Sequence, residues 1–355
     1  MSINSWSRRL GSLVVIVGMA IAAFWASTNS LQIRDWWVLR SYEPPAAISA
    51  LASSASLSDE GQHYFYASQP ELDSKASFNQ HCPTAERTLV LGCYAHLKIY
   101  VLNITDRRLQ GVKEVTAAHE MLHAVYQRLD DGERERIDQL LIKQLKLIKD
   151  KKILKLVAQY RKQEPDALND ELHSILPTQS VKLLSELETY YDQYFVDRQV
   201  VVKAYQDYEA VFTAIQARVD RLNAKINASL KSINNDKQQA DAVADDFSTT
   251  QTQASSVARQ LDQMDKQLKS LQRSGQIAKY NAQVAEYNQL VAQYQALTAE
   301  LESLQTDYNQ LAAQINSNIT AYNDLVDLRN KVAYQSTDLY HVLDSTYEAE
   351  SLSSP

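Results

Sequence analysis

Heptad spacing of apolar residues over residues 196–335 constrains the fold of this chain more than any other feature of its sequence. Large apolar and tyrosine side chains recur there at alternating intervals of three and four residues, the spacing of a coiled-coil seam. The seam residues are Ile215, Val219, Leu222, Ile226, Leu230, Ile233, Val257, Leu261, Met264, Leu268, Leu271, Tyr287, Leu290, Tyr294, Leu297, Leu301, Leu304, Tyr308, Leu311, Ile315, Tyr322 and Leu325. The stretch contains no Pro, and its one Gly lies in Ser274-Gly275. We therefore predict a long antiparallel α-helical coiled-coil hairpin that turns at Ser274-Gly275.

His119, Glu120 and His123 form an H-E-x-x-H pattern in a run, 115–126, that indicates a buried helix. Positions i and i+4 share one face of an α-helix, so both imidazoles can reach one metal ion, and Glu120 can reach the attacking water without being a ligand. Two imidazoles and an adjacent carboxylate are what a zinc hydrolase needs to activate water near neutral pH. A chance pentapeptide is the competing interpretation, but such a pattern is rare in a chain with seven His.

A zinc hydrolase usually has three protein ligands and an open fourth position. The extended pattern H-E-x-x-H-x-x-G-x-x-H would require Gly at position 126 and His at position 129. This chain has Tyr126 and Leu129, so that class is excluded. The third ligand must come from a later segment.

The best candidate for that segment is a short helical stretch that Pro165-Asp166 opens and Pro177 closes. Glu171 is the favoured third ligand, because a carboxylate completes a two-histidine site. Three other roles stay open for a neighbouring histidine, His173. It could be the ligand, hydrogen-bond the oxyanion, or be a partly buried helix histidine.

These residues resemble the gluzincin metallopeptidases, in which a downstream helix supplies a glutamate to an H-E-x-x-H zinc. The resemblance covers roughly residues 100–200, with one departure, since the family's frequent Asn-Glu pair is Asp170-Glu171 here. It implies a zincin-like α+β catalytic domain, Zn²⁺ as cofactor and a peptide or protein substrate. It also implies that the metal ligands are His119, His123 and Glu171 and that Glu120 is the catalytic base.

An uncharged apolar run, 10–26, follows Arg8-Arg9 near the N-terminus. Its length is close to the lower limit for spanning a bilayer, and the positive-inside rule would keep the arginines in the cytoplasm. A cleaved signal peptide is the competing interpretation, but it requires small residues before the cut, and Phe24-Trp25-Ala26 contains a bulky one. We therefore expect a single-pass protein of the cell membrane with its C-terminal bulk extracytoplasmic, similar to envelope-attached bacterial metallopeptidases.

Cys82 and Cys93 are the two cysteines of the chain. Outside the cytoplasm a pair at this spacing is typical of a disulfide, and no C-x-x-C pattern indicates a metal site. Two runs rich in β-branched and aromatic residues, 88–94 and 97–102, predict a β-hairpin. In zinc peptidases a strand beside the H-E-x-x-H helix commonly receives the substrate backbone, so 99–103 is the candidate edge. A purely structural hairpin is the other interpretation.

The predicted fold is mainly α with a small β-hairpin, plus the long helical hairpin. The predicted segments are a cytoplasmic N-terminus (1–9), a transmembrane anchor (10–26), a linker (27–57), a zincin-like metallopeptidase domain (58–195), the coiled-coil hairpin (196–335) and a C-terminal tail (336–355).

The net charge of −7, without aromatic residues among the basic ones, disfavours nucleic-acid binding. The sequence favours a membrane-anchored, extracytoplasmic zinc metallopeptidase, whose partners would be its substrate, the membrane through the anchor, and an envelope protein bound by the coiled coil. One alternative is a structural or scaffolding envelope protein with a structural or degenerate zinc site. A peptidoglycan-directed hydrolase, which uses the same metal chemistry on a different amide, is a third.

Overall fold

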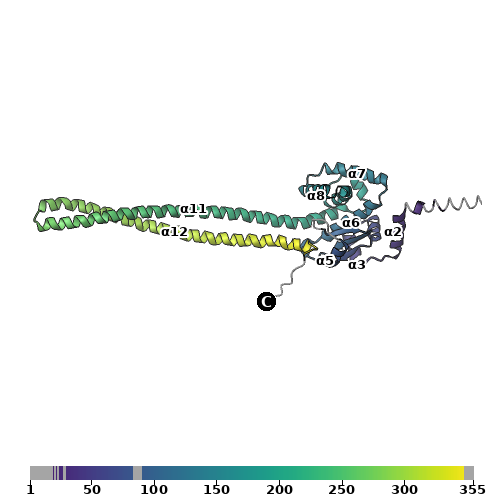
Figure 1. The fold of residues 1–355 in the computed structure, drawn as a ribbon, viewed down its shortest axis with the longest axis horizontal. Helices are drawn as coiled ribbons and strands as arrows, with labels where there is room; N and C mark the ends of the chain where they lie inside the picture. Colours follow the sequence, from purple (N-terminus) through teal and green to yellow (C-terminus); the bar gives the residue numbers. More distant parts are fainter. Residues whose placement is uncertain (1–18, 20, 22–23, 27–28, 83–89, 348–355) are drawn as a thin grey trace, which may run out of the picture. The chain divides into compact units, whose positions relative to one another are not determined.

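The computed structural model describes residues 19, 21, 24–26, 29–82 and 90–347 of the chain. It divides into two compact units, one made of residues 1–214 and 336–355 and the other of residues 215–335. The described part is mainly helical, with one three-stranded sheet and one long helix pair (Figure 1).

The first unit contains the sheet and most of the shorter helices. Its elements are α2 (Ser30–Ser41), α3 (Ala46–Ser54), α4 (Asp59–Ala67), β1 (Glu71–Asp73), α5 (Lys75–His81), β2 (Gly92–Ala95), β3 (Lys98–Leu102), η1 (Arg107–Leu109), α6 (Val112–Arg128), α7 (Asp131–Leu145), α8 (Lys151–Gln163), η2 (Pro165–Ala167), α9 (Leu168–Gln179) and α10 (Ser185–Tyr191). The start of α11 (Arg198–Arg273) and the end of α12 (Ile277–Leu343) also belong to it.

Helix α6 is the centre of the first unit. It packs against the β2–β3 strand pair and against α3, α4 and α9. Small and apolar side chains of α6 allow this close packing, and they are fully buried: Ala117, Ala118, Met121, Leu122 and Ala124. Gly111 caps its N-terminus with φ 96°, a left-handed conformation that favours glycine, and a Cβ there would lie 3.0 Å from that of Ala204 in α11.

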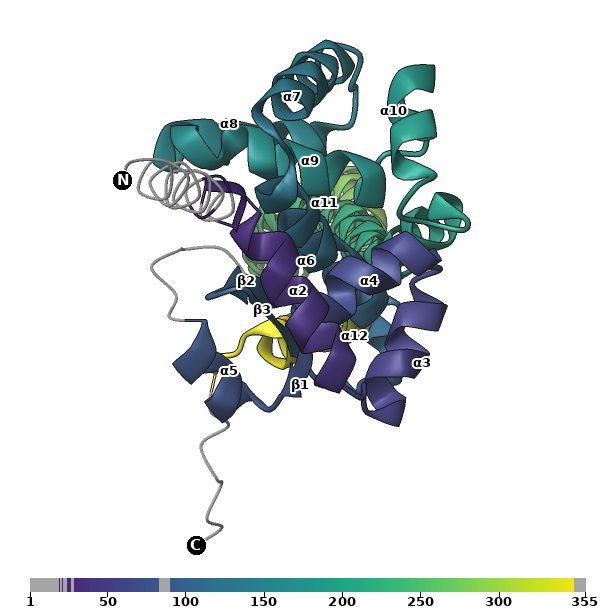
Figure 2. The same ribbon diagram turned by 90° about the vertical axis from the view of Figure 1, so that its right-hand side faces the viewer.

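The sheet has the order β1-β3-β2, with β1 parallel and β2 antiparallel to β3. Alternate residues of a strand point to opposite faces. Ile99 and Val101 of β3 pack in the core with α6, whereas the ring of Tyr100 stacks on His81 of α5. Helices α5 and α6 therefore cover opposite faces of the sheet (Figure 2).

The predicted hairpin is confirmed, but the predicted edge strand is wrong. Segment 99–103 falls on β3, which is paired on both sides, so it cannot accept a further strand. The reason is β1, a strand of only three residues whose pattern in the sequence is too short to recognise. Within the described residues β2 is the strand beside α6 that has a neighbour on one side only. The predicted disulfide between Cys82 and Cys93 is also confirmed.

The predicted end of the α9 segment at Pro177 is wrong, because this proline lies inside the helix. A proline inside a helix lacks the N–H that would bond the carbonyl four residues earlier. That carbonyl belongs to His173, and it accepts a hydrogen bond from the hydroxyl of Tyr191 at 2.9 Å instead. The buried tyrosine therefore allows α9 to continue to Gln179.

The segment predicted as a linker, 27–57, forms α2 and α3. Ile48, Leu51 and Ala52 of α3 are buried in the core of the first unit. Asp35 of α2 is also buried, where its two carboxylate oxygens accept hydrogen bonds from Nε and Nη2 of Arg128 at 2.6 and 2.9 Å.

Among the residues that the structure describes, no helix is both long and apolar enough to cross a membrane. This finding contradicts the single-pass anchor predicted over 10–26 and the membrane localisation that we expected from it. Residues 10–18, 20, 22 and 23 of that segment lie outside the described residues. The next helix, α2, has 12 residues and carries Asp35 and two arginines, so it is too short and too polar to span a bilayer.

The predicted pair of long helices is confirmed in the second unit. Helix α11 ends at Arg273 and α12 begins at Ile277, and between them Gly275 has φ 72°. Residues at similar distances from this turn pack together across the pair: Ala254, Val257 and Leu261 from α11 with Leu290, Leu297 and Leu301 from α12. Asn318 also donates a hydrogen bond to the buried Asp236 at 2.8 Å. Helix α12 continues past the predicted boundary at residue 335 to Leu343.

Replacing Asp35 by Ala should lower the free energy of unfolding by about 3 kcal/mol, because it leaves the guanidinium of Arg128 buried without a counter-charge. Urea denaturation followed by circular dichroism measures the change. Asp207→Ala removes an exposed partner of Lys203 and serves as the control, with an expected change below about 0.5 kcal/mol. An equal, small effect of both substitutions would contradict the importance of the buried pair.

Candidate metal centre

Helix α6 presents His119 and His123 on one face, one turn apart, as their spacing predicts. Their Nε2 atoms lie 3.1 Å from each other. Each imidazole is partly exposed, with 20% and 13% of its side-chain surface accessible, so the pair faces an opening and not the core.

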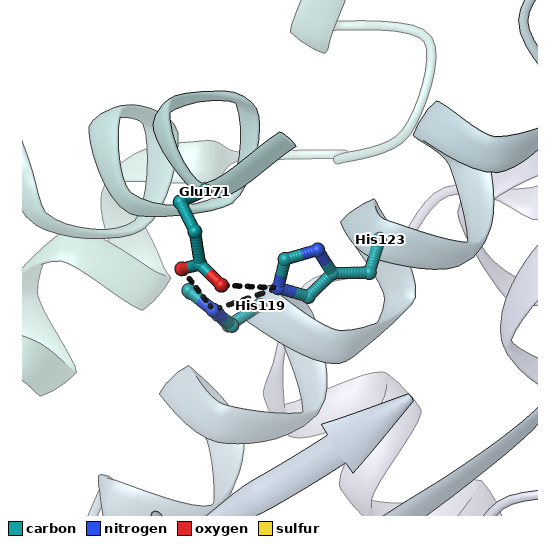
Figure 3. A group of neighbouring side chains, drawn as sticks. All are labelled: His119, His123 and Glu171. Carbon is teal, nitrogen blue, oxygen red and sulfur yellow. Dashed lines mark hydrogen bonds and ion pairs between the residues drawn. The ribbon is translucent and has the colours of Figure 1, made fainter. Parts of the chain in front are cut away.

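Helix α9 packs on α6 and brings Glu171 to the two histidines (Figure 3). Its Oε2 lies 3.7 Å from Nε2 of His119, and its Oε1 lies 3.8 Å from Nε2 of His123. One ligand atom from each of the three residues lies within 4.8 Å of the other two. The structure therefore brings together the three residues that the sequence singled out as ligands.

The donor set of these three residues fits zinc. Ligand atoms 2.0–2.1 Å from a tetrahedral Zn²⁺ are separated from one another by about 3.3 Å. The two Nε2 atoms are 3.1 Å apart, and each has a different oxygen of Glu171 at 3.7 or 3.8 Å, so a rotation of this carboxylate would bring one oxygen to both. Two nitrogen donors and one carboxylate are also the ligand types of catalytic zinc sites that keep a fourth position open.

Asp170 belongs to the candidate site, although the sequence analysis assigned it no role there. Its Oδ1 lies 2.7 Å from Nδ1 of His123, so the imidazole donates to the carboxylate with one nitrogen and turns Nε2 toward Glu171. Carboxylates that bind the far nitrogen of a metal-ligating histidine fix its orientation and increase its basicity. The only signal in the sequence was a second acidic residue next to Glu171.

The charges around the two histidines differ in their effect on each ring. Burial, together with His123 and His173, holds the pKa of His119 well below its ordinary value. Burial also opposes the charged form of His123, but the hydrogen bond and charge of Asp170, with the charges of Glu171 and Glu120, raise its pKa to about 10. The carboxylates therefore favour a positive charge at this place, which a proton on His123 or a metal ion can supply.

His173 is not part of this group. It is fully buried on α9, and its Nε2 lies 2.9 Å from the hydroxyl of Tyr190. Its ring also lies near those of Tyr126 and Tyr191. Burial lowers the pKa of His173 to about 3, with a further contribution from the charge of His123, so the ring is neutral. Of the roles predicted for His173, its surroundings match that of a buried helix histidine.

Glu120 lies on the same helix as the two histidines and is almost completely buried. Strand β2 approaches it closely at Gly92. A Cβ at Gly92 would lie 2.8 Å from Oε1 of Glu120 and 2.5 Å from Cγ2 of Thr116, closer than such atoms can approach. Only glycine lets the strand and the carboxylate come this close.

A cavity of about 550 Å³ opens in front of these residues. His119, Glu120, His123 and Glu171 line it, together with segment 90–95, which includes all of β2. The site therefore combines a candidate metal centre, a buried carboxylate and a strand with an unpaired edge within the described residues.

Comparison with family models, with curated proteins and with solved structures finds no match to this chain. The resemblance to gluzincin metallopeptidases therefore rests on the residues themselves and stays a prediction.

The raised pKa of His123 predicts how the stability of the metal-free protein depends on pH. The pKa of His123 is about 10 in the folded protein, against an ordinary value of 6.5. Protonation of His123 therefore stabilises the fold fully below pH 6.5, and this stabilisation is lost as the pH rises to about 10. Asp170→Asn should remove much of this dependence, because it removes the charge that raises the pKa. Chemical denaturation of chelator-treated protein between pH 6 and 10 measures it. Asp166→Asn, an exposed change, is the control.

Zinc titration should separate the ligand role of Glu171 from the structural role of His173. Loss of a group that only hydrogen-bonds a metal ligand weakens metal binding by roughly 10–100-fold. Glu171→Gln should weaken zinc binding by more than this. His173→Gln should weaken it by less than this, because its ring faces Tyr190 and not the other histidines. Competition with a fluorescent chelator measures both affinities, and the reverse order would transfer the ligand role to His173.

Proposed function

We propose that this chain is a zinc-dependent peptidase that hydrolyses extended peptide segments. The observation that supports the proposal is the convergence of His119, His123 and Glu171 beside Glu120 on the wall of one cavity. A structural zinc site would be closed by four protein ligands, whereas this group supplies three and faces open space. Zn²⁺ bound there would polarise the scissile carbonyl and make the attacking water more acidic.

Glu120 is the base in this proposal. Its carboxylate accepts the proton of the attacking water and passes it to the nitrogen of the leaving group. The carboxylate adjoins the cavity and is almost completely buried, so it meets the water in a site of low dielectric, where electrostatic effects are strong. Gly92 contributes by leaving room for this carboxylate, and Asp170 contributes by orienting His123.

Strand β2 provides the place for the substrate backbone. Its residues line the cavity, and among the described strands it has a neighbour on one side only, so its backbone N–H and C=O groups can pair with an extended peptide as an added strand. Such pairing recognises backbone and not side chains, so it suits a peptidase that accepts unfolded segments. This role replaces the one that the sequence predicted for 99–103.

A scaffolding function is the second candidate, and the long helix pair is the observation that favours it. Helices α11 and α12 have 76 and 67 residues. Their residues between 215 and 335, with the turn that joins them, form a separate compact unit. Its exposed tyrosines include Tyr294, Tyr308 and Tyr334, a residue type common in protein interfaces. In the peptidase proposal the same pair serves to bind a protein partner or substrate.

One zinc ion per chain and hydrolysis of unstructured peptides are the expected results for the purified full-length protein. Glu120→Gln should keep the zinc and lower kcat by about 10²–10⁴-fold, the usual contribution of a general base. Native mass spectrometry and a quenched fluorescent peptide library measure the two quantities. Glu114→Gln, on the same helix but away from the cavity, is the matched control. A zinc-loaded protein that cleaves no peptide would favour the scaffold, and cleavage only of peptidoglycan stem peptides would favour the cell-wall hydrolase.

A further inference from the structure

The cavity extends around the edge of β2 to both faces of the sheet. On the face covered by α6, Gly92 of β2 adjoins Glu120. On the face covered by α5, Cys93 forms the disulfide with Cys82. Both Cys82 and the preceding His81 line the same cavity as the candidate metal ligands. A ligand in the cavity can therefore reach groups on both sides of this strand.

His81 is held in a defined orientation on the α5 face. Its Nδ1 lies 2.7 Å from Oδ2 of Asp73, a buried residue of β1, and its ring stacks on Tyr100 with 4.2 Å between the ring centres. When Nδ1 donates its proton to Asp73, Nε2 keeps its lone pair and can accept a hydrogen bond. About a third of the His81 side chain is exposed, which gives a ligand access to the ring.

The charges near His81 favour a cationic ligand. Asp73 and Glu71 lie on β1 beside the imidazole, and Lys98 of β3 pairs with Glu71 at 2.8 Å. Within the described part of the chain, Asp73 therefore has no lysine or arginine partner. Among the described residues that line the cavity there is no Lys or Arg that would repel such a ligand.

An extended peptide on β2 would point alternate side chains to the two faces of the sheet. The side chains on the α6 face approach the metal ligands, and those between them approach α5. We propose that His81, oriented by Asp73, forms a subsite that binds a lysine or arginine side chain of the substrate, on the face of the sheet opposite the metal. This inference rests on the proposed function only in that a peptide lies along β2.

The basic side chain donates a hydrogen bond to Nε2 of His81 and is attracted by the carboxylate of Asp73. Oxygen and nitrogen atoms of Glu71, Asp73 and His81 also lie within 4.8 Å of one another, as in a metal site. Lys98 already pairs with Glu71, which leaves His81 and Asp73 as the members of this group for a substrate side chain.

Peptide binding to the zinc-loaded full chain carrying Glu120→Gln tests the subsite without relying on hydrolysis. The probes are fluorescent ten-residue peptides in which one position after another carries lysine or norleucine, which has a similar chain but no charge. We expect lysine to bind about tenfold more tightly than norleucine at one position, or at alternate positions, and equally at the neighbouring ones. Fluorescence anisotropy measures the dissociation constants.

Two variants locate the effect. His81→Phe keeps an aromatic ring against Tyr100 but removes Nε2, and Asp73→Asn keeps a hydrogen-bonding partner but removes the charge. In each, the ratio of the two dissociation constants should fall toward one, and circular dichroism and zinc content report whether the variant folds. His63→Phe changes an exposed histidine that does not line the cavity and should keep the tenfold ratio.

Equal binding of lysine and norleucine at every position would overturn the subsite, as would a preference that survives in both variants. A second zinc ion per chain that is lost in His81→Phe would overturn it in favour of a metal site. The failure of the wild-type protein to cleave any peptide would count against the proposed peptidase alone, because the binding ratios are measured independently of hydrolysis.

Discussion

The packing of α9 across α6 is the interaction on which the candidate site depends. It brings Asp170 and Glu171 to histidines about fifty residues earlier in the chain. The C-terminal end of α9 is held by the buried guanidinium of Arg198, whose Nη1 donates to the carbonyls of Pro177 and Ser180 at 2.8 Å each. The start of α9 is held through Asn169, which donates to Asp138, the same carboxylate that accepts from Tyr126 of α6. Both ends of the helix are therefore fixed by hydrogen bonds, and Glu171 has little freedom to leave the histidines.

This packing places several carboxylates around two imidazoles in a partly buried site. Negative charges removed from water are costly unless a cation compensates them. In the metal-free protein the proton on His123 is such a cation, as its raised pKa shows. A divalent ion between the Nε2 atoms would supply more charge at the same place, and Asp170 would still accept the hydrogen bond from Nδ1. The electrostatics and the donor geometry thus both favour a divalent metal ion at this site.

The sequence predicted the parts of the site that depend on local periodicity. His119 and His123 share a face because the helical period requires it, and the heptad seam with one glycine predicts the helix pair and its turn. Asp170 was missed, because which of two adjacent carboxylates meets which histidine depends on the rotation of α9 about its axis. The assignment of the edge strand to 99–103 was wrong. Strand order is a property of tertiary structure, and β1, which pairs with β3, is too short to show in the sequence pattern. The end predicted at Pro177 failed for a similar reason, since a distant tyrosine hydroxyl satisfies the carbonyl that the proline leaves free.

Strand β2 links the candidate metal centre and the proposed subsite through the alternation of its side chains. Gly92 faces Glu120, and the next residue, Cys93, faces α5. A slip of one residue in the pairing of β2 with β3 would exchange the two faces and bring the Cys93 side chain against the Glu120 carboxylate. A strand of four residues has few backbone hydrogen bonds to prevent such a slip. The disulfide to Cys82 prevents it, because Cys93 can reach α5 only from the face that it now occupies. The covalent bond on one face of the sheet therefore keeps Gly92 opposite the Glu120 carboxylate on the other.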